Sequence, residues 1–430
     1  MNTPIHDFLK NFCDKKTSRF FMPGHKGTLS PHDITEIEGA DALFLSDCII
    51  ADSEQNATEL FGSKSTIYGA GGSTSCIGTM LLLTTQPNDT IIASRNAHVS
   101  FYNFSCLLNL NIHWVFPDYN DNLGISGQPT AEQIEKALLK APKAKAVYIT
   151  SPDYMGIPAD MEKIALLCNQ HNVPLLVDNA HGAHLKFLSP DRHPISLGAT
   201  LACDSAHKTL PALTGAAYLH STRFSKVEMK QKMSMISSTS PSYLILESLD
   251  LLNVYLSNNA CSDFSVLTEK RHKVIVAIEK AGFTVLNSDI SKITIDTRTV
   301  KEDVAALMRK SNIEPEYTGT WHIVLLLSPF NTDQDFLRLI SFFENTKFEK
   351  VTIGTEKITI PKPQTKMSMH DAFFANSEII KIDKAIGRIS AETISTCPPG
   401  VPIVVCGEEI LEFSQKYLKI TGKTSVKVVK

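Results

Sequence analysis

Several features that would assign a chain to a particular class are missing from this sequence of 430 residues. Its nine cysteines form no Cys-x-x-Cys pair and are odd in number, which argues against a disulfide framework or a structural zinc site and favours a reducing compartment. No apolar run approaches membrane-spanning length, and residues 1–19 lack the apolar segment of a secretory signal. We therefore expect a cytoplasmic protein with no membrane partner and no metal site.

An excess of charge is also missing. Lys and Arg number 42 against 45 Asp and Glu, and no basic tract carries interleaved aromatic residues, so nucleic acid is not an expected partner. The lysines of residues 416–430 alternate with Ile, Val and Thr, which predicts a strand with a solvated face. One hydrophobic core does not hold a chain of this length, so a main domain should have smaller companions.

From residue 90 onward, short apolar segments alternate with amphipathic helical ones, which predicts an α/β fold with a mostly parallel sheet flanked by helices. Thr130 with Gln133, and separately Asp160, provide the caps of two of these helices. Doubly wound sheets bind ligands just beyond the carboxyl ends of their strands. The strands are expected at residues 90–93, 112–116, 146–150, 174–179, 201–204 and 215–219.

The pattern changes after residue 240, where two helices precede a strand-helix-strand-helix series at residues 292–345. This series predicts a smaller α/β domain. A linker rich in Lys, Thr and Pro, residues 354–366, leads to the last segment. The chain is therefore divided into an N-terminal arm (1–40), a large domain (41–240), a small α/β domain (241–350) and a short C-terminal domain (351–430).

Polar residues at three places in the large domain could carry chemistry. A glycine loop ending at Gly72 leads through Ser73 and Thr74 into an apolar helix, and such a loop offers N–H groups and hydroxyls to a phosphate, although a plain helix cap would look the same. Asp178 ends a buried strand, where a carboxylate needs a cation or donors to stay ionised. His98 follows the first of the strands, and a loop histidine is often only a hydrogen-bonding group.

Lys208 follows Asp178 by 30 residues, in the run Asp-Ser-Ala-His-Lys-Thr-Leu. A desolvated lysine can be neutral and nucleophilic near neutral pH, although most lysines are solvated surface groups. In order, the chain thus offers a phosphate loop, a histidine, a strand-end aspartate and a lysine. Pyridoxal 5'-phosphate needs a lysine for a Schiff base, an acid to keep its ring nitrogen protonated and donors for its phosphate. The joint order therefore indicates this cofactor.

Six short motifs carry a wider likeness: Met-Pro-Gly-His-Lys-Gly (22–27), Gly-Ser-Thr-Ser (72–75), Asn-Ala-His (96–98), Asp-Asn-Ala-His-Gly-Ala-His (178–184), Asp-Ser-Ala-His-Lys-Thr-Leu (204–210) and Pro-Pro-Gly-Val-Pro (398–402). Together they resemble the Orn/Lys/Arg decarboxylase family of fold type I, aspartate aminotransferase-like, pyridoxal phosphate enzymes. The likeness runs from residue 20 to about residue 409. The motifs at 178–184 and 204–210 are distinctive for this family among its fold relatives.

The resemblance implies a role for each motif residue. Lys208 would hold the cofactor as a Schiff base, Asp178 would pair with the pyridine nitrogen, and His98 would stack on the ring. Ala180 would line the opposite ring face, and His181 would lie beside it near the substrate. The residues implied for the phosphate are Ser73, Thr74, Ser205 and His207.

By the same resemblance, the chain would remove the α-carboxylate of a basic amino acid, and the amine would feed polyamine synthesis. Arginine, lysine and ornithine stay open as the substrate. An aminotransferase or a β-eliminating lyase is the nearest alternative, but residues 315–322 offer no arginine to grip an α-carboxylate. Glu316 in this segment could meet the distal cation of the substrate or be only an exposed strand-edge acid. A non-catalytic homologue that still binds the cofactor is a further alternative, although all the implied catalytic residues are present.

Many members of this family begin with a separate domain that builds higher oligomers. Since this chain reaches the 22–27 motif within about two dozen residues, we expect a short form of the enzyme. The resemblance then implies a homodimer or homotetramer with the active site near the subunit interface.

Overall fold

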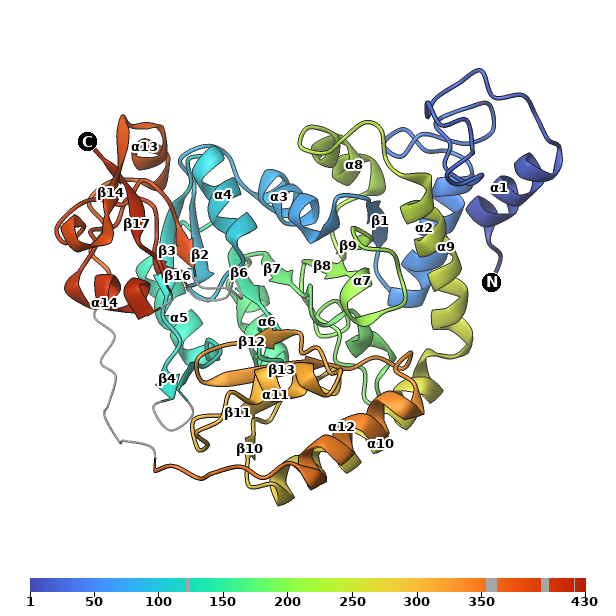
Figure 1. The fold of residues 1–430 in the computed structure, drawn as a ribbon. Coiled ribbons are helices and arrows are strands. Elements are labelled where there is room, and N and C mark those ends of the chain that lie inside the picture. The colour runs from blue at the N-terminus through green and yellow to red at the C-terminus, as the bar shows by residue number, and fades with distance from the viewer. Residues whose placement is uncertain (121–123, 353–361, 396–401, 421) are drawn as a thin grey trace.

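A seven-stranded sheet lies at the centre of the computed structural model, which describes residues 1–120, 124–352, 362–395, 402–420 and 422–430 (Figure 1). Its strand order is β1-β9-β8-β7-β6-β2-β3. Strands β8, β7, β6, β2 and β3 run parallel, while β9 pairs antiparallel with both β8 and β1. The strands are β1 (Ser65–Gly69), β2 (Thr90–Ser94), β3 (Asn111–Val115), β6 (Val147–Thr150), β7 (Leu175–Asp178), β8 (Leu201–Ser205) and β9 (Ala217–Ser221).

Both faces of this sheet are covered by helices. Successive strand residues point to opposite sides, so each face carries its own apolar cluster. Tyr148 and Leu176 belong to one apolar cluster, and their neighbours Val147 and Val177 belong to another on the opposite face. The first face is covered by α3 (Gly72–Thr84), α4 (Val99–Leu107) and α8 (Lys226–Ser234), and the second by α5 (Ala131–Lys140) and α6 (Met161–Gln170). The predicted α/β class is confirmed.

All six predicted strands are present, with ends shifted by at most two residues. The capping box of Thr130 and the cap of Asp160 are present as well. Helix α2 (Ile49–Phe61) was not predicted, because its buried face carries the polar residues Ser53 and Glu54 and so gives no clear apolar period.

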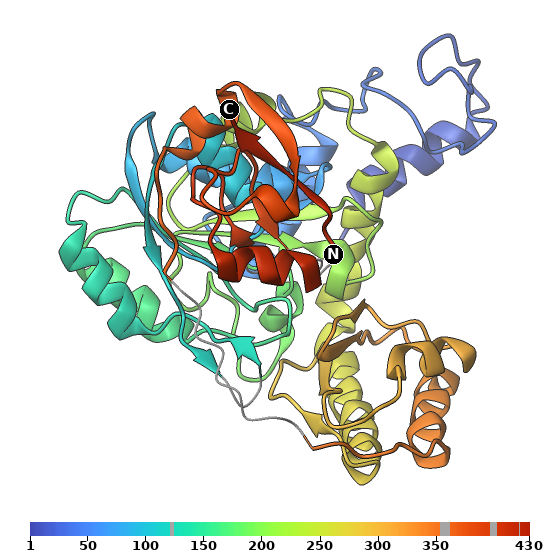
Figure 2. The same cartoon turned by 60° about the vertical axis from the view of Figure 1, so that its left-hand side comes forward.

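A second, smaller sheet follows the long helices α9 (Tyr243–Asn258) and α10 (Ala260–Lys280). It has the order β10-β11-β13-β12 and is antiparallel throughout. With α11 and α12 it forms a lobe below the main sheet in both views (Figures 1 and 2). Its elements are β10 (Thr284–Val285), β11 (Lys292–Asp296), α11 (Val304–Lys310), β12 (Tyr317–Thr318), β13 (His322–Leu326) and α12 (Asp333–Asn345). The domain boundaries given above stay a prediction.

The C-terminal part of the chain contacts the large domain through α13 (Met369–Phe374), which lies against α4. The strand predicted for residues 416–430 is wrong in its first third, where the lysines lie on a helix with an apolar face. The further elements are β14 (Ser377–Lys381), β15 (Ile394–Ser395), β16 (Pro402–Val404), α14 (Glu412–Ile420) and β17 (Ser425–Val429).

Two sequence-based predictions cannot be compared with the fold. Most of the linker at 354–366, and the Pro-Pro-Gly-Val-Pro motif up to residue 401, lie outside the described residues. Within the described ranges, no helix is both long and apolar enough to cross a bilayer.

Candidate active site

Three of the parallel strands end at one edge of the sheet, and each leads directly to a candidate residue. β2 leads to His98, β7 ends at Asp178 with His181 just beyond it, and β8 leads to Lys208 on the short helix α7 (Ala206–Thr209). These four side chains and Ala180 line one cavity of about 1330 Å³. The strand-end rule thus brings together residues that lie more than a hundred positions apart in the chain.

Asp178 is 1% exposed, yet its carboxylate has few firm contacts. The N–H of Ala180 donates to Oδ1 over 3.2 Å, and the hydroxyls of Tyr148 and Thr150 lie 3.3 and 3.4 Å from Oδ2. In the part of the chain that the structure describes, no cationic side chain forms an ion pair with it. The carboxylate therefore keeps acceptor capacity for a donor inside the cavity.

The amine of Lys208 lies 3.1 Å from Nε2 of His181. Burial lowers the pKa of Lys208, and the nearby Asp178 offsets this only in part. Burial also holds the pKa of His181 well below its usual value, with a further contribution from the charge of Lys292. The imidazole is therefore neutral; its Nε2 accepts from the lysine amine, which leaves the ring proton on Nδ1.

His98 is fixed at the wall of the cavity because its ring caps α4. Its Nδ1 accepts the N–H of Ser100 over 3.2 Å and lies 2.9 Å from the hydroxyl of the same residue. Burial lowers the pKa of His98, while Asp178 raises it. A neutral ring held in this way carries its proton on Nε2 and can offer a face to a planar ligand, and its stacking role stays a prediction.

The predicted phosphate residues gather where α3 begins and β8 ends. The hydroxyls of Ser73 and Ser205 are 2.7 Å apart, and the Thr74 hydroxyl is 3.0 Å from that of Ser100. Helix α3 begins without a side-chain cap. The N–H of its first residue, Gly72, donates to the carbonyl of Gly215 over 2.8 Å, so the N–H groups left for an anion are those that follow it in the first turn. His207 is directed differently, since its Nδ1 donates to a backbone carbonyl over 3.0 Å and leaves only Nε2 for a ligand.

Glu316 lies near the cavity but does not line it. It is exposed, and its Oε1 accepts from the hydroxyl of Tyr154 over 2.8 Å. The Tyr154 ring lines the cavity and packs edge-on against His181, with ring centroids 5.1 Å apart. The charge of Glu316 also acts on the pKa of Lys208, and its contact with a substrate stays a prediction.

A buried ion pair in the cavity wall was missed by the sequence analysis. The Arg95 guanidinium donates to both oxygens of Glu408, over 2.6 and 2.7 Å, and neither side chain is more than 5% exposed. Arg95 is the sole arginine among the described residues that line the cavity. Because it is paired, it is not free to grip a substrate carboxylate as an aminotransferase requires.

Lys292 of the small sheet was missed as well. Its buried amine donates to the carbonyls of Asp153 and Tyr154, over 3.1 and 2.8 Å, and burial lowers its pKa to about 8. The strand-end rule would have found Tyr154, which follows β6, and Arg95, which follows β2. No spacing in the sequence pairs Lys292 or Glu408 with the cavity.

Comparisons with known proteins identify the family. Residues 3–265 match the model for "Orn/Lys/Arg decarboxylase, major domain", and residues 354–428 match that for "Orn/Lys/Arg decarboxylase, C-terminal domain". The chain belongs to the Orn/Lys/Arg decarboxylase family. This is a family of pyridoxal phosphate-dependent enzymes that decarboxylate basic amino acids, so the assignment made from the motifs is confirmed.

The relatives extend over nearly the whole chain. An arginine decarboxylase of Bacillus subtilis is 31% identical and covers 97% of this chain and 93% of its own length. An arginine decarboxylase of Bacillus anthracis is 28% identical, with coverages of 97% and 92%. The solved lysine decarboxylase LdcF of Francisella novicida is 18% identical and matches all of this chain and 81% of its own with a TM-score of 0.83, which confirms the fold.

The side chains of the cavity fit the cofactor of this family. Nδ2 of Asn96 and Nδ1 of His181, both in residues that line the cavity, are buried without a hydrogen-bond partner. Orphaned buried polar groups are rare in folded proteins, so two of them in residues that line the cavity point to a polar ligand. Asp178 is an acid of the kind that pyridoxal phosphate needs. The hydroxyls of Ser73 and Ser205 are not among the residues that line the cavity, and they are the candidate donors to the phosphate.

Proposed function

We propose that arginine is the basic amino acid that this enzyme decarboxylates. The observation that most supports a decarboxylase mechanism is the shared cavity of Lys208, Asp178, His98 and His181. Arginine is favoured because several of the relatives matched over nearly the full length are named arginine decarboxylases, whereas the lysine decarboxylase LdcA of Pseudomonas aeruginosa is 22% identical over 49% of the chain. Lysine and ornithine stay as alternatives.

Residues that line the cavity would hold one end of pyridoxal phosphate, and residues at the start of α3 and the end of β8 would hold the other. The amine of Lys208, whose pKa is lowered by burial, would bind it covalently, and Asp178 would accept a hydrogen bond from its ring nitrogen. The hydroxyls of Ser73, Thr74 and Ser205, together with the start of α3, would bind its phosphate. Bound there, the cofactor supplies a protonated ring that accepts the electron pair left when the α-carboxylate departs as carbon dioxide.

The protein side chains then have three tasks. Asp178, which is buried, would keep the ring nitrogen of the cofactor protonated and so would stabilise the transition state more than the ground state. His181 Nε2 accepts the hydrogen bond of the Lys208 amine and orients it. Glu316, held by the hydroxyl of Tyr154, attracts the distal guanidinium of the substrate to the rim of the cavity.

The decisive experiment supplies arginine, lysine and ornithine separately to the purified protein with pyridoxal phosphate. Release of carbon dioxide and of the amine of arginine, at a kcat/KM at least about tenfold above the other two, is expected. A keto acid in place of an amine would make the enzyme an aminotransferase. Cofactor absorbance without carbon dioxide from any of the three would make it a non-catalytic homologue.

We also infer a homodimer or homotetramer with the active site near the subunit interface. Phe20, Leu29 and Leu45 of the N-terminal segment are 96%, 84% and 84% exposed, which is typical of side chains that a partner covers. Light scattering of the purified protein tests this, and a monomer would contradict it. The cytoplasmic location and the link to polyamine synthesis stay predictions; the eight described cysteines are free, as a reducing compartment requires.

A further inference from the structure

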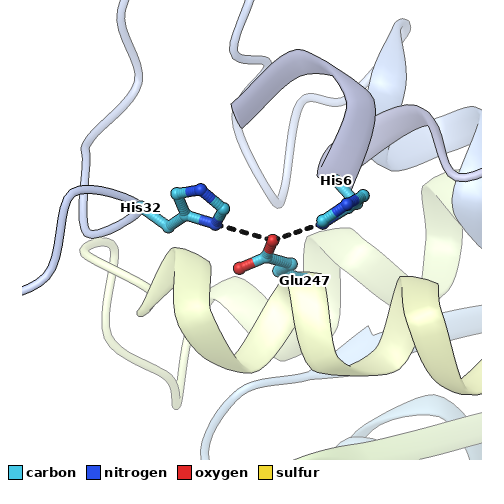
Figure 3. A group of neighbouring side chains, drawn as sticks. All are labelled: His6, His32 and Glu247. Carbon is cyan, nitrogen blue, oxygen red and sulfur yellow. Dashed lines mark hydrogen bonds and ion pairs between the residues drawn. The ribbon is translucent and has the colours of Figure 1, made fainter. Parts of the chain in front are cut away.

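Three side chains of metal-ligand type meet outside the cavity, where the N-terminal segment joins α9 (Figure 3). His6 lies on α1 (Pro4–Asp14), His32 lies in the loop after this helix, and Glu247 lies on α9. Nδ1 of His6 and Nδ1 of His32 are 2.7 and 2.8 Å from the same atom, Oε1 of Glu247. The three ligand atoms all lie within 4.8 Å of one another.

A second cluster of metal-ligand type, His193, Asp204 and His220, has a complete hydrogen-bond network. His193 and His220 both donate from Nε2 to Oδ2 of Asp204, over 3.0 and 3.3 Å, and all three residues are fully buried. Nδ1 of His220 is 2.8 Å from the hydroxyl of Thr66, and Nδ1 of His193 accepts a backbone N–H. Since every ring nitrogen is in use, this cluster offers no ligand atom to an ion.

The cluster of His6, His32 and Glu247 is open by comparison. Its side chains are 31%, 26% and 11% exposed. Among the described residues, none bonds to Nε2 of either ring or to Oε2 of the carboxylate, and none of the ion pairs brings a lysine or arginine to it. One carboxylate oxygen thus holds two imidazole nitrogens together, with one side facing solvent.

We propose that His6, His32 and Glu247 bind one divalent transition-metal ion, and two imidazole nitrogens with one carboxylate oxygen suit Zn²⁺. In a tetrahedral site with bonds of about 2.0–2.2 Å, neighbouring ligand atoms lie about 3.3 Å apart. The two Nδ1 atoms therefore need to move away from the oxygen by about half an ångström, which the loop of His32 permits. Each neutral ring then carries its proton on Nε2, and water takes the fourth position.

The ion has a structural role in this proposal. Helix α1 is already tied to α9, because the N–H groups of Ile5 and His6 donate to Oδ2 of Asp250 over 3.0 Å each. His32 belongs to the following loop, which also carries the exposed Leu29. An ion shared by His32 and Glu247 links that loop to α9 and restricts its motion.

The test uses the full-length holoenzyme without a polyhistidine tag, treated with a chelator and dialysed free of unbound cofactor. Calorimetric titration with Zn²⁺ should show one ion per chain, and Co²⁺ should give the absorption of a tetrahedral site. His32→Ala and Glu247→Gln should each weaken Zn²⁺ binding by at least about tenfold. His272→Ala is the matched control, because it removes an exposed histidine from α10, and should leave binding unchanged.

Limited proteolysis gives a readout that does not depend on the titration. Zn²⁺ should slow cleavage between α1 and α2 in the wild type and in His272→Ala, and should have no effect in His32→Ala. Because His32 lies in a loop, its replacement leaves the fold intact. Failure of the wild type to bind Zn²⁺ at micromolar concentration, or binding as strong as that of the wild type in both cluster variants, overturns the proposal.

Discussion

Asp178 and Asp204 stand near the ends of neighbouring parallel strands and are buried to the same degree, but their surroundings differ. Both oxygens of Asp204 are engaged: Oδ2 accepts from His193 and His220, and Oδ1 accepts from Asn179 over 2.7 Å. Asp178 has one backbone donor at 3.2 Å, two longer hydroxyl contacts, a weak thiol donor in Cys203 at 3.8 Å and a side that faces the cavity. One carboxylate is saturated, and the other is not.

This difference separates a structural carboxylate, Asp204, from one that can bind a ligand, Asp178. Burial by itself raises the pKa of Asp204, but the two imidazoles beside it outweigh burial and hold that pKa below its usual range. Its charge is thus satisfied within the protein, and it stabilises the end of β8 just ahead of Lys208. The charge of Asp178 is fully satisfied only when a ligand donates to it. We expect substitutions of cavity residues such as Asp178 to reduce catalysis, and substitutions of Asp204 to reduce stability.

Lys208→Ala should have the largest effect on the cavity side. It removes the amine that would bind the cofactor, so turnover should fall below detection, and the cofactor should no longer be fixed to the protein by borohydride. Mass spectrometry of the reduced protein measures this. A label that persists would move the attachment to another lysine, with Lys26 and Lys292 the first to examine.

Asp178→Asn should have the next largest effect on turnover. The neutral amide keeps the shape of the side chain but cannot hold a proton on the cofactor ring, so kcat should fall by about 10²–10³-fold. Some cofactor should still bind, and the melting temperature should change little, because the carboxylate has few firm contacts to lose. Near-normal turnover would refute the role given to this residue.

Asp204→Asn should show the opposite balance. His193 and His220 lose their charged partner, so the free energy of unfolding should drop by about 3 kcal/mol while kcat falls much less. Since the folded pKa of Asp204 lies below the unfolded value of about 3.9, the carboxylate stabilises the fold above that value, and this stability is lost as the pH falls through the folded pKa. Urea unfolding should therefore show a smaller gap between variant and wild type at about pH 3 than at neutral pH. A gap that is constant with pH would assign the effect to packing alone.

Short-range patterns predicted the sheet and the motif residues, because each is written in a few consecutive positions. The apolar run of β7 and the aspartate at its end are one local signal, and the same is true of β8 with Lys208. What the sequence did not reveal depends on distance along the chain: Arg95 and Glu408 are 313 residues apart. Nor does any spacing show that His193 and His220 both turn toward Asp204.

Glu316→Gln tests the comparison at its weakest point, the rim of the cavity. Like Asp178, Glu316 is a carboxylate with acceptor capacity left, since the described contacts give it one side-chain donor, Tyr154. An exposed charge pair contributes at most about 1 kcal/mol, so the KM for arginine should rise by no more than about fivefold with kcat nearly unchanged. Glu314→Gln is the matched control, because Glu314 is equally exposed and already pairs with Arg309 over 2.9 Å. If the two variants behave alike, or if Glu316→Gln lowers kcat instead, the guanidinium of the substrate is bound by other groups. A carboxylate with unused acceptor capacity would then indicate a ligand contact only inside the cavity.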